Sequence, residues 1–481
     1  MRLFCVLLMF ISGIYSSASA QYALSGLVTD ALTGQALSNV VVYLPEFQLT
    51  TQTTDAGYFQ FNDLHSGSFL VEFKASAYHN RIEEIELDAT THLLVQLQPA
   101  VKECHEVIVT GVSRNANAAI SPLQVQTLQS AQFMRLTSSS LVEAVAVMPG
   151  VSTRSTGSAI AKPIIRGLGA NRIITLTNGI RQEGQQWGEE HGIEIDEYAI
   201  DRVELIKGPG SLLYGSDGIA GVLHFLTPKA LPAGAMQSKL LTNYQSNHHL
   251  IGTSLSTAGA KKQFQWQAQL SSKLAGDYRN AADGYVTNSG FRELNATLFL
   301  GLTKKWGFSQ VHLSSFNQLV NLPEGERDSL GHFNYLDLNG IVRTADPLHF
   351  SGYAIGAPHQ EIHHLKLVAN QSVIVKKGNW LLDLAFQSNQ RKEISEVMAA
   401  QTPYLFFELN TFNTNLRFNF RKQNGWYHTL GFGGMYQINT NHGLKAMIPN
   451  HQLLDAGVYG ITQKKWNQWN WIFGLRVDQR L

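Results

Sequence analysis

The sequence predicts a mainly β protein built of several domains, the last of which is part of an antiparallel transmembrane β-barrel. Its 481 residues exceed the roughly 150 expected of one domain. Residues 21–99 contain short β-prone runs separated by glycine turns, which is typical of a small Ig-like or transthyretin-like β-sandwich. From residue 235 to residue 481 the runs are longer and alternate apolar with polar side chains, as membrane-barrel strands do. The intervening residues 115–230 combine glycine-rich turns with short helical and β-prone stretches and predict an α+β domain.

Residues 1–20 predict a signal peptide. Arg2 precedes an apolar run that is too short to span a bilayer, and Ala18-Ser19-Ala20 is the small-residue pattern that signal peptidase accepts. We therefore expect export, with cleavage after Ala20. Removal of this segment takes Cys5 with it and leaves Cys104 without an intrachain disulfide partner.

The net charge excludes one class of partner. The chain has 37 Lys and Arg residues against 36 Asp and Glu residues. Because no strong positive field results, we expect no nucleic-acid partner.

The predicted sandwich resembles a known module. Turns are expected at Thr33-Gly34, Asp55-Ala56-Gly57 and His65-Ser66-Gly67. The phrases SGLVTDALTGQAL, TTDAGYFQF and SGSFLVEF resemble the carboxypeptidase regulatory-like domain. Asp30 and Asp55 are interpreted as turn-forming residues rather than ligands, so this domain is assigned no chemistry.

The α+β segment resembles the plug domain of TonB-dependent outer-membrane receptors. The resemblance is carried by KPIIRGLGANRIITLTNGIRQEG, with its Arg166-Gly167 step and Asn178-Gly179 turn, and by DRVELIKGPGSLLYGSDGIAGVLHFLTP. It implies an outer-membrane location, contact with outer-membrane lipid, and active uptake of a ligand driven by the TonB–ExbB–ExbD energy complex. Glycines 167, 169, 208, 210 and 215 are expected to form tight turns.

A linker at residues 100–114 contains a candidate coupling segment. Its members are Glu106, Val107, Ile108, Val109, Thr110 and Gly111. An extended β-prone run of this kind suits addition to the edge of a partner's sheet. The resemblance implies TonB as that partner. The alternative is that the run is simply the first strand of the plug.

The barrel strands can be counted from their turns. Short turns are expected at Gly259–Lys262, Lys304–Gly307, Lys376–Asn379, Lys422–Gly425 and Gln463–Trp466, and long connections at Asn317–Gln360 and Ser388–Asn410. Two strands for each short turn, plus a first strand at Gln237–Gln245, give eleven. Receptors of the family have 22 strands, so the sequence predicts the N-terminal half of a barrel in a truncated or partial chain.

Two further sets of residues are candidates for function. The resemblance implies that Arg166 and Glu204 form ion pairs between plug and barrel wall and so act as a latch; pairing inside the plug is the alternative. Histidines and carboxylates suit zinc, copper or iron. The candidate metal ligands are Glu189, Glu190 and His191 in the plug and His359, His363 and His364 near an expected outer loop.

These candidates favour a receptor for a scarce metal ion or metal complex, with no bound cofactor required. Siderophore, haem, cobalamin, glycan and peptide remain alternative ligands. The His-x-x-Glu spacing of His191 and Glu194 also occurs in zinc carboxypeptidases. Such an enzyme needs a packed α/β core, which the alternating strands do not provide, so the chain is not expected to be an enzyme.

Overall fold

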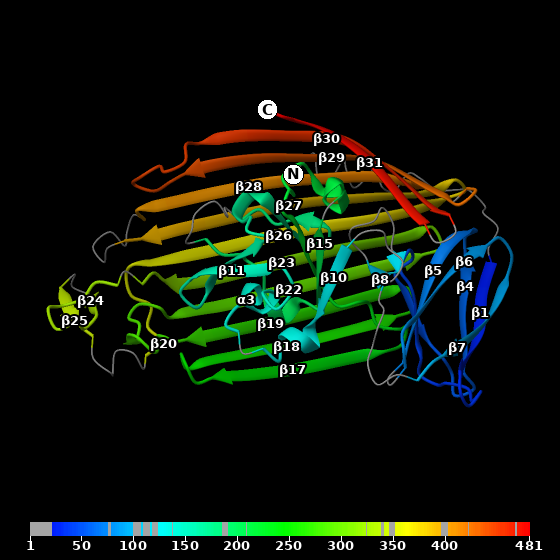
Figure 1. Ribbon diagram of the computed structural model, residues 1–481, viewed down its shortest axis with the longest axis horizontal. Coiled ribbons are helices and arrows are strands. Elements are labelled where there is room, and N and C mark those ends of the chain that lie inside the picture. The colour runs from blue at the N-terminus through cyan, green and yellow to red at the C-terminus, as the bar shows by residue number, and fades with distance from the viewer. Residues whose placement is uncertain are drawn as a thin grey trace.

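The structure is a computed structural model. It describes residues 22–75, 78–99, 107–108, 116–117, 124–136, 138–184, 191–207, 209–323, 325–337, 341–345, 352–395, 403–421, 423–466 and 469–481. In Figure 1 a small β-sandwich lies at one end of a long curved sheet, and a compact α+β domain fills the hollow of that sheet. The predicted mainly β fold is confirmed.

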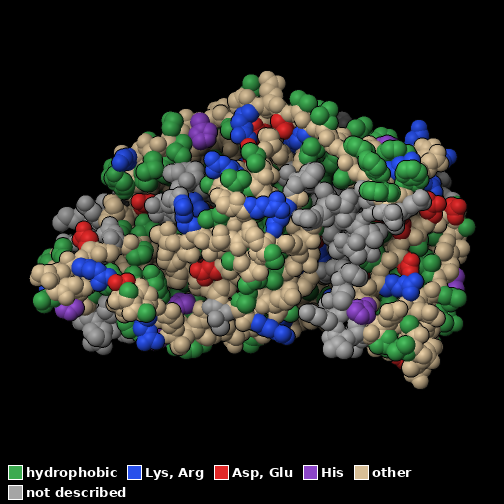
Figure 2. All heavy atoms as spheres, in the orientation of Figure 1, with side chains coloured by type: hydrophobic (Ala, Val, Ile, Leu, Met, Phe, Trp, Pro, Cys, Tyr) green, Lys and Arg blue, Asp and Glu red, His purple; other side chains and the backbone are tan. Residues whose placement is uncertain are grey.

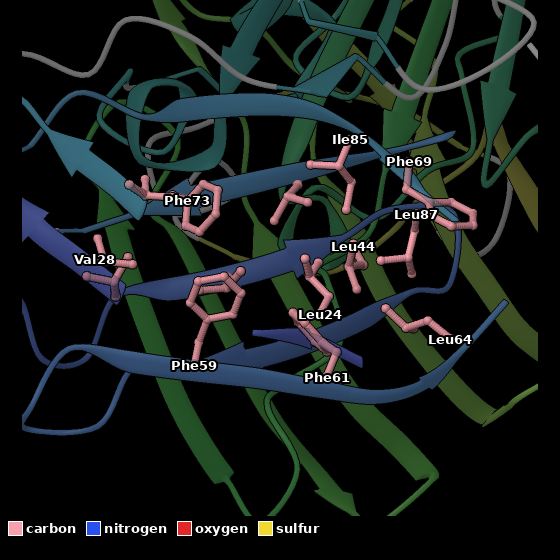
Figure 3. Packing of buried hydrophobic residues seen from close by; sticks show 14 of the residues in the cluster. Leu24, Val28, Leu44, Phe59, Phe61, Leu64, Phe69, Phe73, Ile85 and Leu87 are labelled. Carbon is pink, nitrogen blue, oxygen red and sulfur yellow. The ribbon is translucent and has the colours of Figure 1, made fainter. Parts of the chain in front are cut away.

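The N-terminal sandwich consists of two sheets. Its strands are β1 (Tyr22–Asp30), β2 (Val41–Leu44), β3 (Leu49–Gln52), β4 (Tyr58–Leu64), β5 (Gly67–Lys74), β6 (Arg81–Leu87) and β7 (Thr91–Leu97). One sheet has the order β4-β1-β7 and the other β3-β2-β5-β6. Alternate side chains such as Leu24, Phe59 and Phe73 point between the sheets and form the core (Figure 3).

Asp30 forms a turn, as predicted. Its carboxylate accepts hydrogen bonds from the backbone N–H groups of Leu32 (2.7 Å) and Thr33 (2.9 Å) and from the Tyr78 hydroxyl (2.7 Å). These bonds, with that of Tyr78 the strongest, lower the pKa of Asp30. The side chain is therefore committed to local structure.

The α+β domain is built on a five-stranded sheet. Its elements are β10 (Gln124–Gln129), α2 (Ser130–Phe133), α3 (Leu141–Val145), β11 (Val151–Thr156), β12 (Ile160–Ile165), η1 (Ala170–Arg172), β13 (Ile173–Thr177), β14 (Ile180–Arg181), η2 (Glu197–Ala199), β15 (Arg202–Lys207), η3 (Pro209–Tyr214) and β16 (Gly221–Leu226). The sheet order is β10-β15-β16-β13-β14. Helix α3 packs Val145 and Leu141 onto the core, and the side chain of Ser140 caps its first turn by accepting from the N–H of Glu143.

Two turns of this domain require positive φ, as the sequence predicted. Arg166 and Gly167 have φ of 50° and 80°, and Asn178 and Gly179 have φ of 51° and 81°. Tight hairpin turns use this conformation at both central positions, which favours glycine and asparagine.

The long sheet contains eleven strands among the described residues. They are β17 (Met236–Gln245), β18 (Leu250–Lys261), β19 (Phe264–Ala275), β22 (Phe291–Lys304), β23 (Gly307–Asn321), β26 (His359–Val375), β27 (Gly378–Ile394), β28 (Leu405–Phe420), β29 (Trp426–Asn441), β30 (His451–Trp466) and β31 (Trp469–Arg480). They follow one another in chain order and are antiparallel throughout. The predicted strand count is confirmed, as is the first strand to within one residue.

The two faces of the sheet differ as predicted. Leu294, Leu298 and Leu300 on β22 are exposed on the convex face, whereas Asn295 is buried against the plug side. Figure 2 shows hydrophobic side chains gathered over β30 and β31 at its upper margin. Exposed apolar residues on one face and polar residues on the other match a wall between lipid and a polar lumen.

The turns also alternate in length. Short turns follow β18, β22, β26, β28 and β30, and longer connections follow β19, β23, β27 and β29. The strands extend further into the long connections than predicted, because β27 ends at Ile394 and β28 begins at Leu405. Small hairpins β20 (Arg279–Asn280) with β21 (Gly284–Tyr285) and β24 (Asn334–Leu336) with β25 (Val342–Thr344) lie in the long connections.

Candidate functional site: the contact between plug domain and wall

A plug-domain loop, residues 191–198, contacts the wall of the long sheet at two places. The residues at its centre are Glu194 and Asp196, both nearly fully buried. Glu194 contacts strands β26 and β27, and Asp196 contacts β19. One short loop therefore joins the α+β domain to two separate parts of the wall.

Glu194 is the most strongly held side chain of the loop. Its Oε1 accepts from Nη2 of Arg391 at 2.5 Å, and its Oε2 accepts from Nδ2 of Asn389 at 2.8 Å and lies 2.8 Å from Nδ1 of His364. The Glu194, His364 and Arg391 side chains are each 2% exposed. We call this group, Glu194 with His364, Asn389 and Arg391, the Glu194 anchor. Charge-assisted hydrogen bonds of this kind are the strong ones when water is excluded.

The Nδ1 atom of His364 has two kinds of neighbour. It can donate to the Glu194 carboxylate at 2.8 Å when it carries the proton, or accept from Nδ2 of Asn389 at 3.1 Å when it does not. Its other ring nitrogen, Nε2, is buried and has no hydrogen-bond partner among the described residues. Arg391 also donates through Nη1 to Oε1 of Gln360 at 2.7 Å, which ties its guanidinium to the neighbouring strand β26.

Gly184 makes the anchor possible. A Cβ at this position would lie 2.1 Å from Oε2 of Glu194, well inside contact distance. The neighbouring Gln182 donates from Nε2 to the Glu194 carbonyl at 2.9 Å and accepts from Lys366 Nζ at 3.1 Å. Residues 182–184 and the loop that begins at residue 191 thus contact the same two wall strands, β26 and β27.

The second contact surrounds Asp196. Its carboxylate accepts from the Ser271 hydroxyl at 2.7 Å, from the Gln269 amide at 3.2 Å and from the Tyr198 N–H at 3.1 Å. Burial raises the pKa of Asp196 to about 6, although the Ser271 hydrogen bond opposes this shift. Next to it, Glu197 pairs with Lys273 of β19 at 3.1 Å.

The predicted latch residues occupy different surroundings. Glu204 is fully buried on β15 and accepts from Nη2 of Arg202 at 3.1 Å, a pair within one strand of the plug domain. Arg166 is exposed in the turn that follows β12. The structure therefore shows the Glu204–Arg202 pairing inside the plug domain that the sequence left as the alternative, and it shows plug–wall pairing at Glu194, a residue not predicted for that role.

The predicted metal ligands are not all in one place. Glu189 and Glu190 lie outside the described residues, and His191 is buried at the start of the loop. His359, His363 and His364 all lie on strand β26 rather than in a loop, because the strand starts at His359. His363 is exposed on the outer face and contacts Asn317 (2.9 Å), whereas His364 points inward, since consecutive strand residues face opposite ways.

A metal site is not assembled by these residues alone. Across the described ranges no group of three or more His, Cys, Asp or Glu side chains is arranged to hold a metal ion. His364 does line a cavity of about 70 Å³ between plug domain and wall together with Glu194, Asp196 and His312.

Arg391, the main partner in the anchor, was not predicted from the sequence. A signal was available in the sequence: Arg391 precedes Lys392 on an alternating strand, so an outward Lys392 implies that Arg391 points inward.

The predicted coupling segment lies mostly outside the described residues. Only Val107 and Ile108 are described, as β8 (Val107–Ile108), which pairs with β9 (Ala116–Asn117). The predicted signal peptide, residues 1–20, also lies outside. No helix in the described part of the chain is sufficiently long and apolar to cross a membrane.

Comparisons with known proteins agree with this architecture. Family models of the TonB-dependent receptor plug domain and the carboxypeptidase regulatory-like domain match residues 118–222 and 23–98. An iron-regulated outer membrane virulence protein of Vibrio cholerae is 34% identical over 163 residues, 31% of this chain and 24% of that protein. A hemin receptor of Yersinia enterocolitica is 26% identical over 158 residues, 32% of this chain and 23% of that protein.

Solved structures share the fold over a larger part of the chain. The copper transporter OprC superposes with a TM-score of 0.56 at 14% sequence identity, covering 74% of this chain and 55% of that one. The chain thus spans about half the length of this neighbour. Two of these proteins are named as a receptor, for hemin, and as a transporter, of copper. The chain thus contains a match to the TonB-dependent receptor plug domain and a match to the carboxypeptidase regulatory-like domain, and it shares its fold with a solved copper transporter.

Proposed function

We propose that this chain is part of an outer-membrane receptor that takes up a scarce nutrient, a metal ion or metal complex, with energy from TonB–ExbB–ExbD. The observation that carries the proposal is the plug domain seated in the hollow of the sheet and anchored to the wall through the buried Glu194. A domain held in this way closes the passage until force displaces it. The relatives named for haem and copper transport support a metal-containing cargo.

The proposed cargo site is the plug-domain segment that contains Glu189, Glu190 and His191. These residues would supply carboxylate and imidazole ligands to zinc, copper or iron as cargo. The alternative cargoes are a siderophore, haem, cobalamin, a glycan or a peptide. These larger ligands would be held by the long connections of the wall rather than by these three side chains.

Calorimetry with zinc, copper and iron(II) on the full-length receptor tests the cargo. We expect tight binding of one metal that is lost in the Glu190→Ala/His191→Ala variant. The matched control is His363→Ala, which removes an imidazole from the outer face of β26. If neither receptor binds a free metal, the cargo is one of the larger ligands. Equal loss in the control variant would contradict the assignment to this segment.

The proposed energy coupling resides in Glu106–Gly111. TonB would add to this run as a β-strand, so its backbone N–H groups supply the binding. Replacement Ile108→Pro removes one of these donors and fixes φ. We expect ligand binding at the cell surface to persist while energised uptake stops, measured with radiolabelled ligand in cells. The conservative control Ile108→Val should keep uptake, and loss of surface binding in the proline variant would contradict the coupling role.

A further inference from the structure

The N-terminal sandwich closes the end of the long sheet at which the short turns lie. In Figure 1 it sits against that end, opposite the long connections that carry β24 and β25. Asp63 pairs with Lys305 in the β22–β23 turn at 3.0 Å, and Gln265 at the start of β19 donates to the carbonyl of Gln48 at 3.3 Å. The hydroxyl of Tyr427, at the start of β29, donates to Glu84. Three separate turns of the wall therefore contact the sandwich.

The sandwich also holds the link between plug and wall. Lys229, between β16 and β17, pairs with Glu72 at 2.7 Å, and its ammonium lies 4.6 Å from the centre of the Tyr43 ring. The Glu72 side chain is 2% exposed. Thr50 donates to the carbonyl of Ala230 at 3.2 Å. The Lys229 side chain is 28% exposed. This ion pair is therefore better shielded from solvent than the Asp63–Lys305 pair on the rim, which is about half exposed.

A chamber lies between the three units. It has a volume of about 270 Å³ and is lined by Tyr43 of the sandwich, His224 of the plug domain, and Gln310 and Asn379 of the wall, among others. This approaches the size of small-molecule sites. In outer-membrane barrels short turns face the periplasm, so the chamber lies on the exit side of the plug. The sandwich forms its outer boundary.

We propose that the sandwich is a displaceable lid on the periplasmic mouth of the receptor, held shut chiefly by the Glu72–Lys229 pair. The orientation rests on the proposed function, but the lid itself does not depend on which cargo is carried. Cargo that has passed the plug enters the chamber and leaves it only when the sandwich swings away. The solvent-exposed rim contacts guide reclosure and add little resistance, because exposed ion pairs are screened.

The lid is tested by the accessibility of the chamber. Gln310→Cys is introduced into a Cys104→Ser background, since the side chain of Gln310 lines the chamber. A membrane-impermeant maleimide is added from the periplasmic side, and the rate of labelling is measured. We expect slow labelling in the otherwise native receptor. Glu72→Lys places two ammonium groups together and should speed labelling by roughly tenfold or more, as breaking a buried pair does.

Two further variants decide the interpretation. The exchange Glu72→Lys/Lys229→Glu restores the pair and should restore slow labelling, which a misfolded sandwich would not do. The control Glu83→Lys changes a partly exposed acid on the same domain, which pairs with Arg81 of the same strand at 2.5 Å, and this variant should label at the native rate. Native-rate labelling of Glu72→Lys, or fast labelling of the exchange variant, would overturn the lid. Neither readout requires the cargo to be a metal.

Discussion

Removal of the Arg391 guanidinium should loosen the plug domain from the wall. In Arg391→Gln, Glu194 keeps its contacts with His364 and Asn389 but loses the guanidinium of Arg391, which lies 2.5 Å from its Oε1. Breaking a buried pair from one side costs about 3–5 kcal/mol, since a charge is left in a site without water. The two remaining hydrogen bonds place this case at the lower end, about 3 kcal/mol.

The assay is hydrogen exchange of the plug domain in the detergent-extracted receptor. A loss of about 3 kcal/mol corresponds to roughly a hundredfold faster exchange for amides that open with this contact. Residues 180–184, which lie against β26 and β27, should show it first. The matched control is Lys392→Gln on the same strand. Its pair with Glu361 at 3.2 Å is partly exposed to solvent and should matter by at most about 1 kcal/mol.

A double-mutant cycle separates the pair from the general effect of either change. Glu194→Gln/Arg391→Gln replaces both charges by amides of similar size, so the double variant should cost less than the sum of the single ones by about 2 kcal/mol. Additive losses, or equal acceleration in Lys392→Gln, would refute the reasoning that a buried charge pair holds the plug domain.

Two other predictions concern the same loop. Gly184→Ala places a methyl group against the Glu194 carboxylate and should lower the stability of the plug domain by about 1–3 kcal/mol. The control Gly192→Ala should be tolerated, because the nearest atom to the added methyl group would be 3.7 Å away. Hydrogen exchange compares the two variants, and equal effects would contradict the steric account. The pKa of Asp196 is about 6 in the folded chain against 3.8 in a model peptide. Between about pH 4 and pH 6 the folded state therefore binds more protons than the unfolded state. The contribution of Asp196 to the stability of the plug domain is largest below about pH 4 and falls by about 3 kcal/mol as the pH rises through 6. Asp196→Asn should remove this dependence in unfolding titrations, and an unchanged pH profile would count against it.

The wall was predictable because its signal is local and repeated. Alternation of apolar and polar residues along β22 fixes which side chains face outward without knowledge of the partner strand. The same rule could have separated the two adjacent histidines of β26. His363 shares its face with the outward Leu365, and His364 shares the inner face with Ile362 and Lys366. Counting histidines by proximity in sequence ignored this alternation.

The Glu194 anchor was not predictable in the same way. Arg391 lies 197 residues from Glu194 in the sequence, and their contact depends on how the plug domain seats against the wall. An acidic loop segment and an inward arginine on a strand are each common. Only their meeting in a place without water makes them a strong pair. The family resemblance pointed instead to Arg166 and Glu204. The structure shows Arg166 in an exposed turn after β12 and Glu204 in a pair inside the plug sheet.

The topology of the plug sheet indicates what force on the N-terminal side would do. Strand β10 lies at one edge of the sheet and β14 at the other, so a pull on the chain before β10 first loads the antiparallel pairing of Gln124–Gln129 with Arg202–Lys207. Such an edge opens one residue pair at a time, whereas the Glu194 anchor at the β14 side breaks only as a unit. Force delivered by TonB, if it acts as proposed, would therefore unravel the N-terminal edge while the far edge stays fixed to the wall. Arg391→Gln should change partial unravelling into displacement of the whole plug domain, because its remaining attachment would then be weaker than the sheet itself.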